Sequence, residues 1–178
     1  APDVESIYDV PLNFEKDNLG NLLLDALSLS KETVADFSKW DNFVSRIKAG
    51  GPEVKIGIVG KYFDTGDFVL SDAYLSVIEA LKFSGAAIGV KPKIEWLNAK
   101  DFQSGEGVEK LSEYDGIIVP GGFGETGIEG KLHAIRYARE NKIPYFGLCY
   151  GMQLMVVEYA RIVLGLSGAH TVEINPDA

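Results

Sequence analysis

Apolar and polar residues follow one pattern in the N-terminal part of the chain and another after it. The N-terminal part holds two stretches with apolar residues at helical spacing, residues 19–27 and 38–47. A short extended piece is expected to end near Pro11, and Ser38 is expected to cap the second helix. The sequence Ala-Gly-Gly-Pro at residues 49–52 can continue neither helix nor strand, so it predicts a linker.

From Val54 onward, short β-branched runs alternate with longer stretches of helical period. The runs VKIGIVG, KPKIEWLN, DGIIV and IPYFGL predict four strands, of which the second is polar enough to lie near an edge. Helices are expected over residues 71–85, with Ser71 as the cap and Gly85 as the end, near 108–112, over 128–140 and from 150 to 164. This order predicts an α/β fold, an open and mostly parallel sheet with helices on both faces, in which ligands bind at the carboxyl ends of the strands.

Length and composition narrow the class of protein. With 178 residues, 46% of them hydrophobic, the chain can bury one core with an appendage. A net charge of -9 without a basic cluster argues against nucleic acid as a partner. The absence of a long apolar run and of a signal-peptide pattern predicts a cytoplasmic protein without a membrane partner. One cysteine and two histidines leave no disulfide and no structural metal site.

The single cysteine lies in the sequence PYFGLCYGMQ, between the fourth predicted strand and the helix after it. A nucleophile on a sharp strand-to-helix turn needs small residues two positions before and after it, because their Cα atoms approach neighbouring backbone. Gly147 and Gly151 occupy these positions. Because a helix N-terminus favours the thiolate of Cys149, we interpret it as a nucleophile for an amide or thioester, with a buried inert thiol as the alternative.

An acyl-transfer site also needs hydrogen-bond donors for the negative oxygen of its intermediate. In enzymes with this turn, one donor is the backbone N–H after the nucleophile, here Tyr150, and another comes from a neighbouring loop. Gly121 and Gly122 of the sequence PGGFG are expected to supply the second, since backbone without side chains lets a substrate approach closely. Gln153, one helical turn after Cys149, is expected either to point at the substrate or to bridge loops.

A general base is the part of such a site that the sequence does not supply. Cysteine hydrolases use a histidine that a carboxylate orients, and the chain holds only His133 and His170. Neither histidine stands in a convincing position, and both are interpreted as surface or loop residues.

Five segments occur in the order VKIGIVGKY, SDAYLSVIEALKFSG, DGIIVPGGFG, ARENKIPYFGLCYGMQ and VVEYARIVLGLSGAHTVEINP. Together they closely resemble the glutamine amidotransferase domain of the CTP synthase family, a class I, triad-type glutaminase. The resemblance includes residues 1–48, where SIYDVPLNFEKDNL and FSKWDNFV look like the end of the amidoligase (synthase) domain and its linker. It implies that residues 49–178 are the N-terminal part of a flavodoxin-like glutaminase domain that is incomplete at its C-terminus.

The resemblance also implies roles for individual residues. Cys149 matches the nucleophile that forms a γ-glutamyl thioester and releases ammonia. The positions that match glutamine contacts are Gly122, Tyr150, Gly151, Met152, Gln153 and Glu173. The ammonia would pass to the synthase domain, which uses ATP and Mg²⁺ to aminate UTP to CTP, and the parent enzyme would be a homotetramer.

Four features depart from the family pattern. The catalytic His-x-Glu pair and a glutamine-binding arginine of the family lie beyond the segment around Glu173, so the chain alone is expected to be poorly active or inactive. Thr126 stands where relatives carry arginine in a loop linked to activation by GTP. Tyr150 stands where leucine is usual, and the loop from Phe63 to Leu70 is longer than in many relatives.

Two other interpretations remain at the level of sequence. A stand-alone cysteine hydrolase of similar fold would use His133 or His170 as its base, and would need one of these imidazoles within hydrogen-bond reach of the sulfur. A non-catalytic α/β binding module would instead leave Cys149 inert and slow to react with alkylating reagents.

Overall fold

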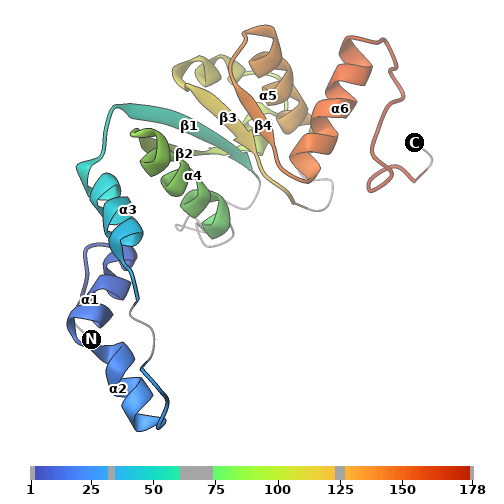
Figure 1. Cartoon of the computed structure of the whole chain (residues 1–178). Coiled ribbons are helices and arrows are strands. Elements are labelled where there is room, and N and C mark those ends of the chain that lie inside the picture. Colours follow the sequence, from blue (N-terminus) through green and yellow to red (C-terminus); the bar gives the residue numbers. More distant parts are fainter. Residues whose placement is uncertain (1–2, 32–34, 61–73, 123–126, 177–178) are drawn as a thin grey trace. The chain divides into compact units, whose positions relative to one another are not determined.

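The computed structural model of this protein describes residues 3–31, 35–60, 74–122 and 127–176 (Figure 1). The chain divides into two compact units, one of residues 1–52 with 83–91 and one of residues 53–82 with 92–178. The described helices and strands, with η for a 3-10 helix, are η1 (Ile7–Asp9), α1 (Val10–Lys16), α2 (Leu19–Ala26), α3 (Ser38–Ala49), β1 (Glu53–Gly60), α4 (Leu75–Ile88), β2 (Lys91–Asn98), η3 (Ala99–Phe102), η4 (Val108–Glu113), β3 (Gly116–Val119), α5 (Ile128–Glu140), β4 (Tyr145–Gly147) and α6 (Tyr150–Ile162).

The second unit is built on a four-stranded sheet with the order β2-β1-β3-β4. Strand β3 pairs in parallel with β1, where Ile56 lies beside Gly116, and with β4, where Val119 lies beside Gly147. The polar strand β2 is at an edge, as its sequence predicts. The α/β fold class is therefore confirmed, and the carboxyl ends of β3 and β4 come side by side.

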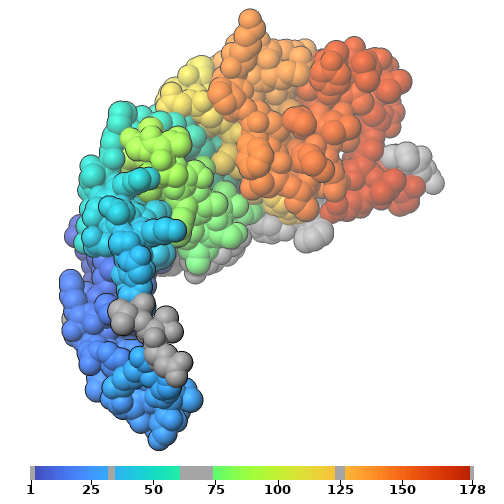
Figure 2. All heavy atoms as spheres, viewed as in Figure 1, coloured from blue at the N-terminus to red at the C-terminus, as the bar shows by residue number. Residues whose placement is uncertain are grey.

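Alternate residues of the central strands pack on opposite faces of this sheet. Ile58 and Ile118 join the cluster that includes side chains of α4, whereas Val59 and Val119 join the larger cluster formed with α5 and α6. Helices thus cover both faces, as expected for a parallel sheet. The outer side of α6 stays exposed and lies at the surface in Figure 2.

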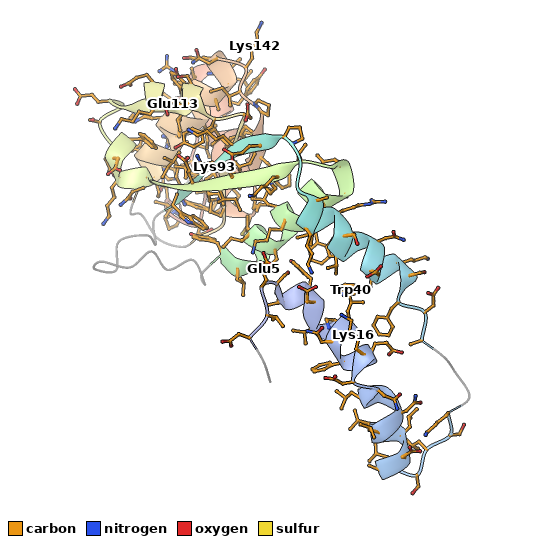
Figure 3. The ribbon with its side chains drawn as sticks, turned by 90° about the vertical axis from the view of Figure 1, so that its left-hand side faces the viewer. Glu5, Lys16, Trp40, Lys93, Glu113 and Lys142 are labelled. Carbon is orange, nitrogen blue, oxygen red and sulfur yellow. The ribbon has the colours of Figure 1, made fainter. Side chains whose placement is uncertain are left out.

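Four aromatic side chains pack against one another in the first unit, and Tyr8 is the buried member of this cluster. Tyr8 contacts Trp40, Phe43 and Phe83 edge to face, and the ring centres of Phe43 and Phe83 are 4.4 Å apart. Trp40 Nε1 donates a 2.9 Å hydrogen bond to the Tyr8 carbonyl, and Figure 3 shows Trp40 between α3 and the N-terminal helices. These contacts hold α3 against the N-terminal helices of its unit. The assignment of residues 1–48 to the end of an amidoligase domain stays a prediction.

Three local predictions are wrong. The chain around Pro11 is helical, because proline in the first turn of α1 lacks an N–H that would be unpaired there anyway. Ser38 is the first residue of α3 rather than its cap, and the Asp36 carboxylate accepts its N–H at 2.9 Å. Helix α4 continues through Gly85 and ends before Gly89, whose φ of 75° suits glycine.

The predictions made for Ser71, Thr126 and residues 63–70 fall on residues outside the described ranges. The predicted helix over 128–140 agrees with α5 to the residue, and that from 150 to 164 agrees with α6 to within two. In the described part of the chain, no helix is both long and apolar enough to cross a membrane.

Candidate active site

Cys149 lies on the turn between β4 and α6, at the carboxyl end of the sheet. Its backbone has φ 52° and ψ -109°, a conformation that is strained for a residue with a side chain. Its side chain is exposed. The sharp turn predicted from the glycine pair is therefore present, and the alternative of a buried thiol is wrong.

The two glycines of the turn touch backbone through their Cα atoms. A Cβ atom at Gly147 would lie 2.6 Å from the Gly151 carbonyl carbon and from the Met152 nitrogen. A Cβ atom at Gly151 would collide with the Val119 carbonyl oxygen and lie 2.8 Å from its carbon. Close packing of backbone from β3, β4 and α6 therefore determines where Cys149 stands.

The loop after β3 lies directly against the cysteine. A Cβ atom at Gly121 would be 3.3 Å from the Cys149 Cβ and 3.7 Å from its Sγ. Among the hydrogen bonds between described residues, none uses the backbone N–H of Gly122 or of Tyr150. Among the described residues, the two segments that meet at the sulfur therefore each hold a backbone donor without a partner, and an oxyanion hole requires such donors.

Tyr74 belongs to this site, although no sequence motif pointed to it. Its side chain is buried, and its hydroxyl donates a 3.4 Å hydrogen bond to the Gly121 carbonyl. Because the C=O and N–H of a trans peptide point in opposite directions, this bond helps to orient the N–H of Gly122. The signal that could have identified Tyr74 is that a buried tyrosine hydroxyl usually finds a partner.

The Tyr150 side chain belongs to the core of the second unit. Its ring is 2% exposed, its hydroxyl has no hydrogen-bond partner among the described residues, and the Lys131 Nζ lies 5.7 Å from the ring centre. Burial, with a smaller effect of the Glu173 charge, raises the pKa of Tyr150 to about 12. Only the backbone of Tyr150 is therefore available to a substrate. Of the other predicted contacts, Gly151 is buried and Met152 is exposed.

Thr171 brings Gln153 and Glu173 together, and sequence reasoning missed it. Its hydroxyl donates to Gln153 Oε1 at 3.0 Å and accepts the Glu173 N–H at 3.3 Å. The Arg161 guanidinium donates a 2.7 Å hydrogen bond to the carbonyl of residue 169. We call residues 169–175 the clasp, because these bonds fasten the segment to α6. The available signal was a threonine two residues before Glu173, a spacing typical of a local hydroxyl turn.

Both histidines form hydrogen bonds with residues other than Cys149. The His133 Nδ1 lies 2.9 Å from the Phe102 carbonyl oxygen, to which it donates, and the His170 Nδ1 accepts the Thr171 N–H at 2.9 Å. Within the described ranges, neither forms a hydrogen bond with Cys149. In the part of the chain that the structure describes, no group of three or more His, Cys, Asp or Glu side chains could hold a metal ion.

Residues 69–175 match the family model described as Glutamine amidotransferase class-I. The chain is 49% identical over 177 residues to the CTP synthase of Halalkalibacterium halodurans, and 53% identical over 176 residues to that of Thermococcus gammatolerans. Each match covers 99% of this chain and 32% of the relative, so the chain spans about a third of their length.

A solved structure agrees with the sequence matches. The glutaminase domain of Trypanosoma brucei CTPS with bound acivicin is 38% identical, with a TM-score of 0.62 that covers 70% of this chain and 47% of that domain. The residues matched by the family model include the turn at Cys149 and the strands β3 and β4 on either side of the glycine loop. The chain therefore belongs to the class-I glutamine amidotransferase family, and the relatives that match it along nearly its whole length are CTP synthases.

Proposed function

We propose that this chain is the glutaminase part of a CTP synthase, and that it hydrolyses glutamine to supply ammonia for the ATP-dependent amination of UTP to CTP. The observation that carries the proposal is the exposed Cys149 on a strained turn, with the glycine loop after β3 against its sulfur. Its partners would be L-glutamine and the synthase domain of the same enzyme, in the homotetramer that the family implies.

In the proposed reaction, the Cys149 sulfur attacks the side-chain amide carbon of glutamine. A C–S bond forms, and the electron pair of the carbonyl moves to the oxygen, which accepts hydrogen bonds from the N–H groups of Tyr150 and Gly122. When the C–N bond breaks, the nitrogen takes a proton and leaves as ammonia. Water then hydrolyses the γ-glutamyl thioester to glutamate and the free thiol.

Recognition of the amino acid would come from the start of α6 and the clasp. The Glu173 side chain is exposed and carries a negative charge that suits the α-ammonium group of glutamine. The Gln153 amide can donate to a carbonyl or carboxylate oxygen. Both lie on segments that Thr171 connects.

The proton-transfer groups would come from outside residues 1–178, since His133 and His170 have other partners. ATP and Mg²⁺ would bind in the synthase domain, and the residues of this chain act only on glutamine. Without a positioned base, turnover by the isolated chain should be slower by several orders of magnitude than turnover by the full-length enzyme.

Ammonia release from glutamine tests the proposal. The full-length protein should release ammonia, its Cys149→Ala variant should lose at least about 10³-fold in rate, and the isolated chain should be nearly inactive. An active Cys149→Ala protein would rule out the proposed mechanism. Rapid and Cys149-dependent turnover by the isolated chain would instead favour the stand-alone hydrolase, because the base would then lie within these residues.

Alkylation of the thiol tests the non-catalytic alternative. An exposed Cys149 at a helix N-terminus should react with iodoacetamide at neutral pH far faster than a buried thiol. Slow labelling in the folded protein, with normal labelling after unfolding, would support an inert cysteine in a binding module.

A further inference from the structure

We propose that Thr171 positions the glutamine-binding side chains of this site, an inference that rests on the function proposed above. The Thr171 hydroxyl bonds to the side-chain amide of Gln153 and to the backbone N–H of Glu173, the two residues whose side chains would contact the amino acid. It would bind no atom of the substrate itself. Its role would be to orient the side-chain amide of Gln153 and to hold the turn that presents Glu173.

The hydrogen bonds of Thr171 have a definite direction. The Glu173 N–H can only donate, so the Thr171 oxygen accepts it, and the single hydroxyl hydrogen is then directed at Gln153 Oε1. The amide oxygen of Gln153 is occupied in this way, and no described residue accepts a hydrogen bond from its NH₂ group, which leaves two donors. Gln153 is therefore fixed as a donor towards a bound ligand.

Burial makes these bonds hard to exchange for bonds to water. Thr171 is 9% exposed, whereas Gln153 is half-buried and Glu173 is exposed. The Thr171 carbonyl accepts two further N–H groups, from Ile174 at 3.1 Å and Asn175 at 3.0 Å, which close the turn around Glu173. The Ile174 side chain packs against the main core. The turn that presents Glu173 is thus held by hydrogen bonds to both the hydroxyl and the carbonyl of Thr171.

The side chains of the clasp lie close to the start of α6. The charge of Glu173 contributes to raising the pKa of Tyr150, the residue after Cys149. Gln153 is one turn further along the same helix. Among the hydrogen bonds between described residues, none joins Thr171 to Cys149, Gly121 or Gly122, so loss of the Thr171 hydroxyl should leave the cysteine turn in place. Substrate binding would weaken while the reacting groups stayed in place.

Two substitutions in the full-length protein separate these effects. Thr171→Val keeps the shape of the side chain but removes the hydroxyl, and Thr171→Ser keeps the hydroxyl. From the loss of the two hydrogen bonds, we expect Thr171→Val to raise the KM for glutamine about tenfold with kcat within about twofold of wild type. Thr171→Ser should retain both constants within about twofold.

Labelling of Cys149 provides a readout that does not require turnover. A chloromethyl ketone analogue of glutamine must be recognised as an amino acid, whereas iodoacetamide needs only an accessible thiol. Thr171→Val should lower the labelling rate with the analogue by about the same factor as it raises KM, and should leave the rate with iodoacetamide unchanged. Peptide mass spectrometry identifies Cys149 as the labelled residue.

Two outcomes would overturn the positioning role. One is a Thr171→Val protein with the wild-type KM and analogue labelling rate. The other is an equal fall in both labelling rates, which would mean that the substitution distorts the cysteine turn. Failure of the proposed function is a different result, in which Cys149 of the wild-type protein shows no preference for the analogue and no ammonia is released.

Discussion

The cysteine turn and the clasp would form two sides of the same glutamine site, yet they are held by different forces. The turn depends on backbone contact, since neither Gly147 nor Gly151 leaves room for a Cβ atom. The clasp depends on hydrogen bonds from the side chains of Arg161 and Thr171. Close packing tolerates no added atom, whereas hydrogen bonds can be removed one at a time. Substitutions of the two turn glycines should therefore impair folding, and those in the clasp should mainly impair binding.

The largest effect is expected from Gly151→Ala. The added methyl group would overlap the Val119 carbonyl, so β3 and α6 must separate, and the free energy of unfolding should fall by about 4 kcal/mol or more. Urea unfolding followed by circular dichroism measures this change. Gly168→Ala is the matched control, because a Cβ atom there meets nothing within 4 Å. Similar stability of the two variants would mean that backbone contact does not determine the turn.

An ion pair between Arg139 of α5 and the buried Glu158 of α6 tests whether both regions depend on the packing of α6. The Arg139 Nε and a terminal nitrogen lie 2.9 and 2.7 Å from the Glu158 carboxylate, which is 2% exposed. Arg139→Met would leave a buried charge without its partner and should lower the free energy of unfolding by about 2–3 kcal/mol. Both the turn and the clasp should then become more susceptible to proteolysis.

The control for this variant is the exposed pair of Arg136 and Glu140, with a distance of 2.9 Å. Arg136→Met should change the free energy of unfolding by no more than about 0.5 kcal/mol, because water screens this pair. Equal effects of Arg136→Met and Arg139→Met would show that burial of Glu158 does not matter.

Tyr150→Phe distinguishes the contribution of the Tyr150 hydroxyl from that of the Tyr150 backbone N–H. The hydroxyl is buried without a partner among the described residues, so its removal should raise the free energy of unfolding by about 1 kcal/mol. Ammonia release should stay the same, because the proposed donor is the backbone N–H. A loss of activity with unchanged stability would assign the hydroxyl a role in the site.

The same variant should change the response to alkali. Burial raises the pKa of Tyr150 from 10.0 to about 12, so the unfolded chain releases this proton at lower pH than the folded protein. The contribution to stability is complete below pH 10 and is lost as pH rises through 12. Burial raises the pKa of Tyr145 and of Tyr114 as well. Tyr150→Phe should therefore reduce, without abolishing, the loss of stability in alkaline urea titrations.

Apart from the control variants, the smallest loss of stability is expected from Arg161→Met, at the clasp. It removes the 2.7 Å hydrogen bond to the carbonyl of residue 169, and because the guanidinium is partly exposed, the cost should be about 0.5–1 kcal/mol. The KM for glutamine should rise more clearly than the free energy of unfolding falls. If Arg161→Met destabilises the protein as much as Gly151→Ala, the difference drawn between the two regions is wrong.

Prediction from sequence succeeded where the signal was local. The glycines two positions before and after Cys149 predicted the turn, and the polar strand KPKIEWLN was correctly expected at an edge. It failed for Thr171 and Tyr74, whose hydroxyls bond to residues 18 and 47 positions away. Such partners cannot be identified from spacing, because each depends on how separate elements pack.

The order of apolar runs, helical stretches and glycines determined by itself that this chain forms an α/β sheet with a cysteine at the end of a strand. Periodicity and glycine spacing act over a few residues, so they can be interpreted without knowing the rest of the fold. Only the tertiary structure decided which groups surround that cysteine, including the Gly121 peptide held by Tyr74 and the Thr171 hydroxyl between Gln153 and Glu173. Their hydrogen bonds require atoms from distant segments to meet within about 3 Å, and packing alone sets that distance.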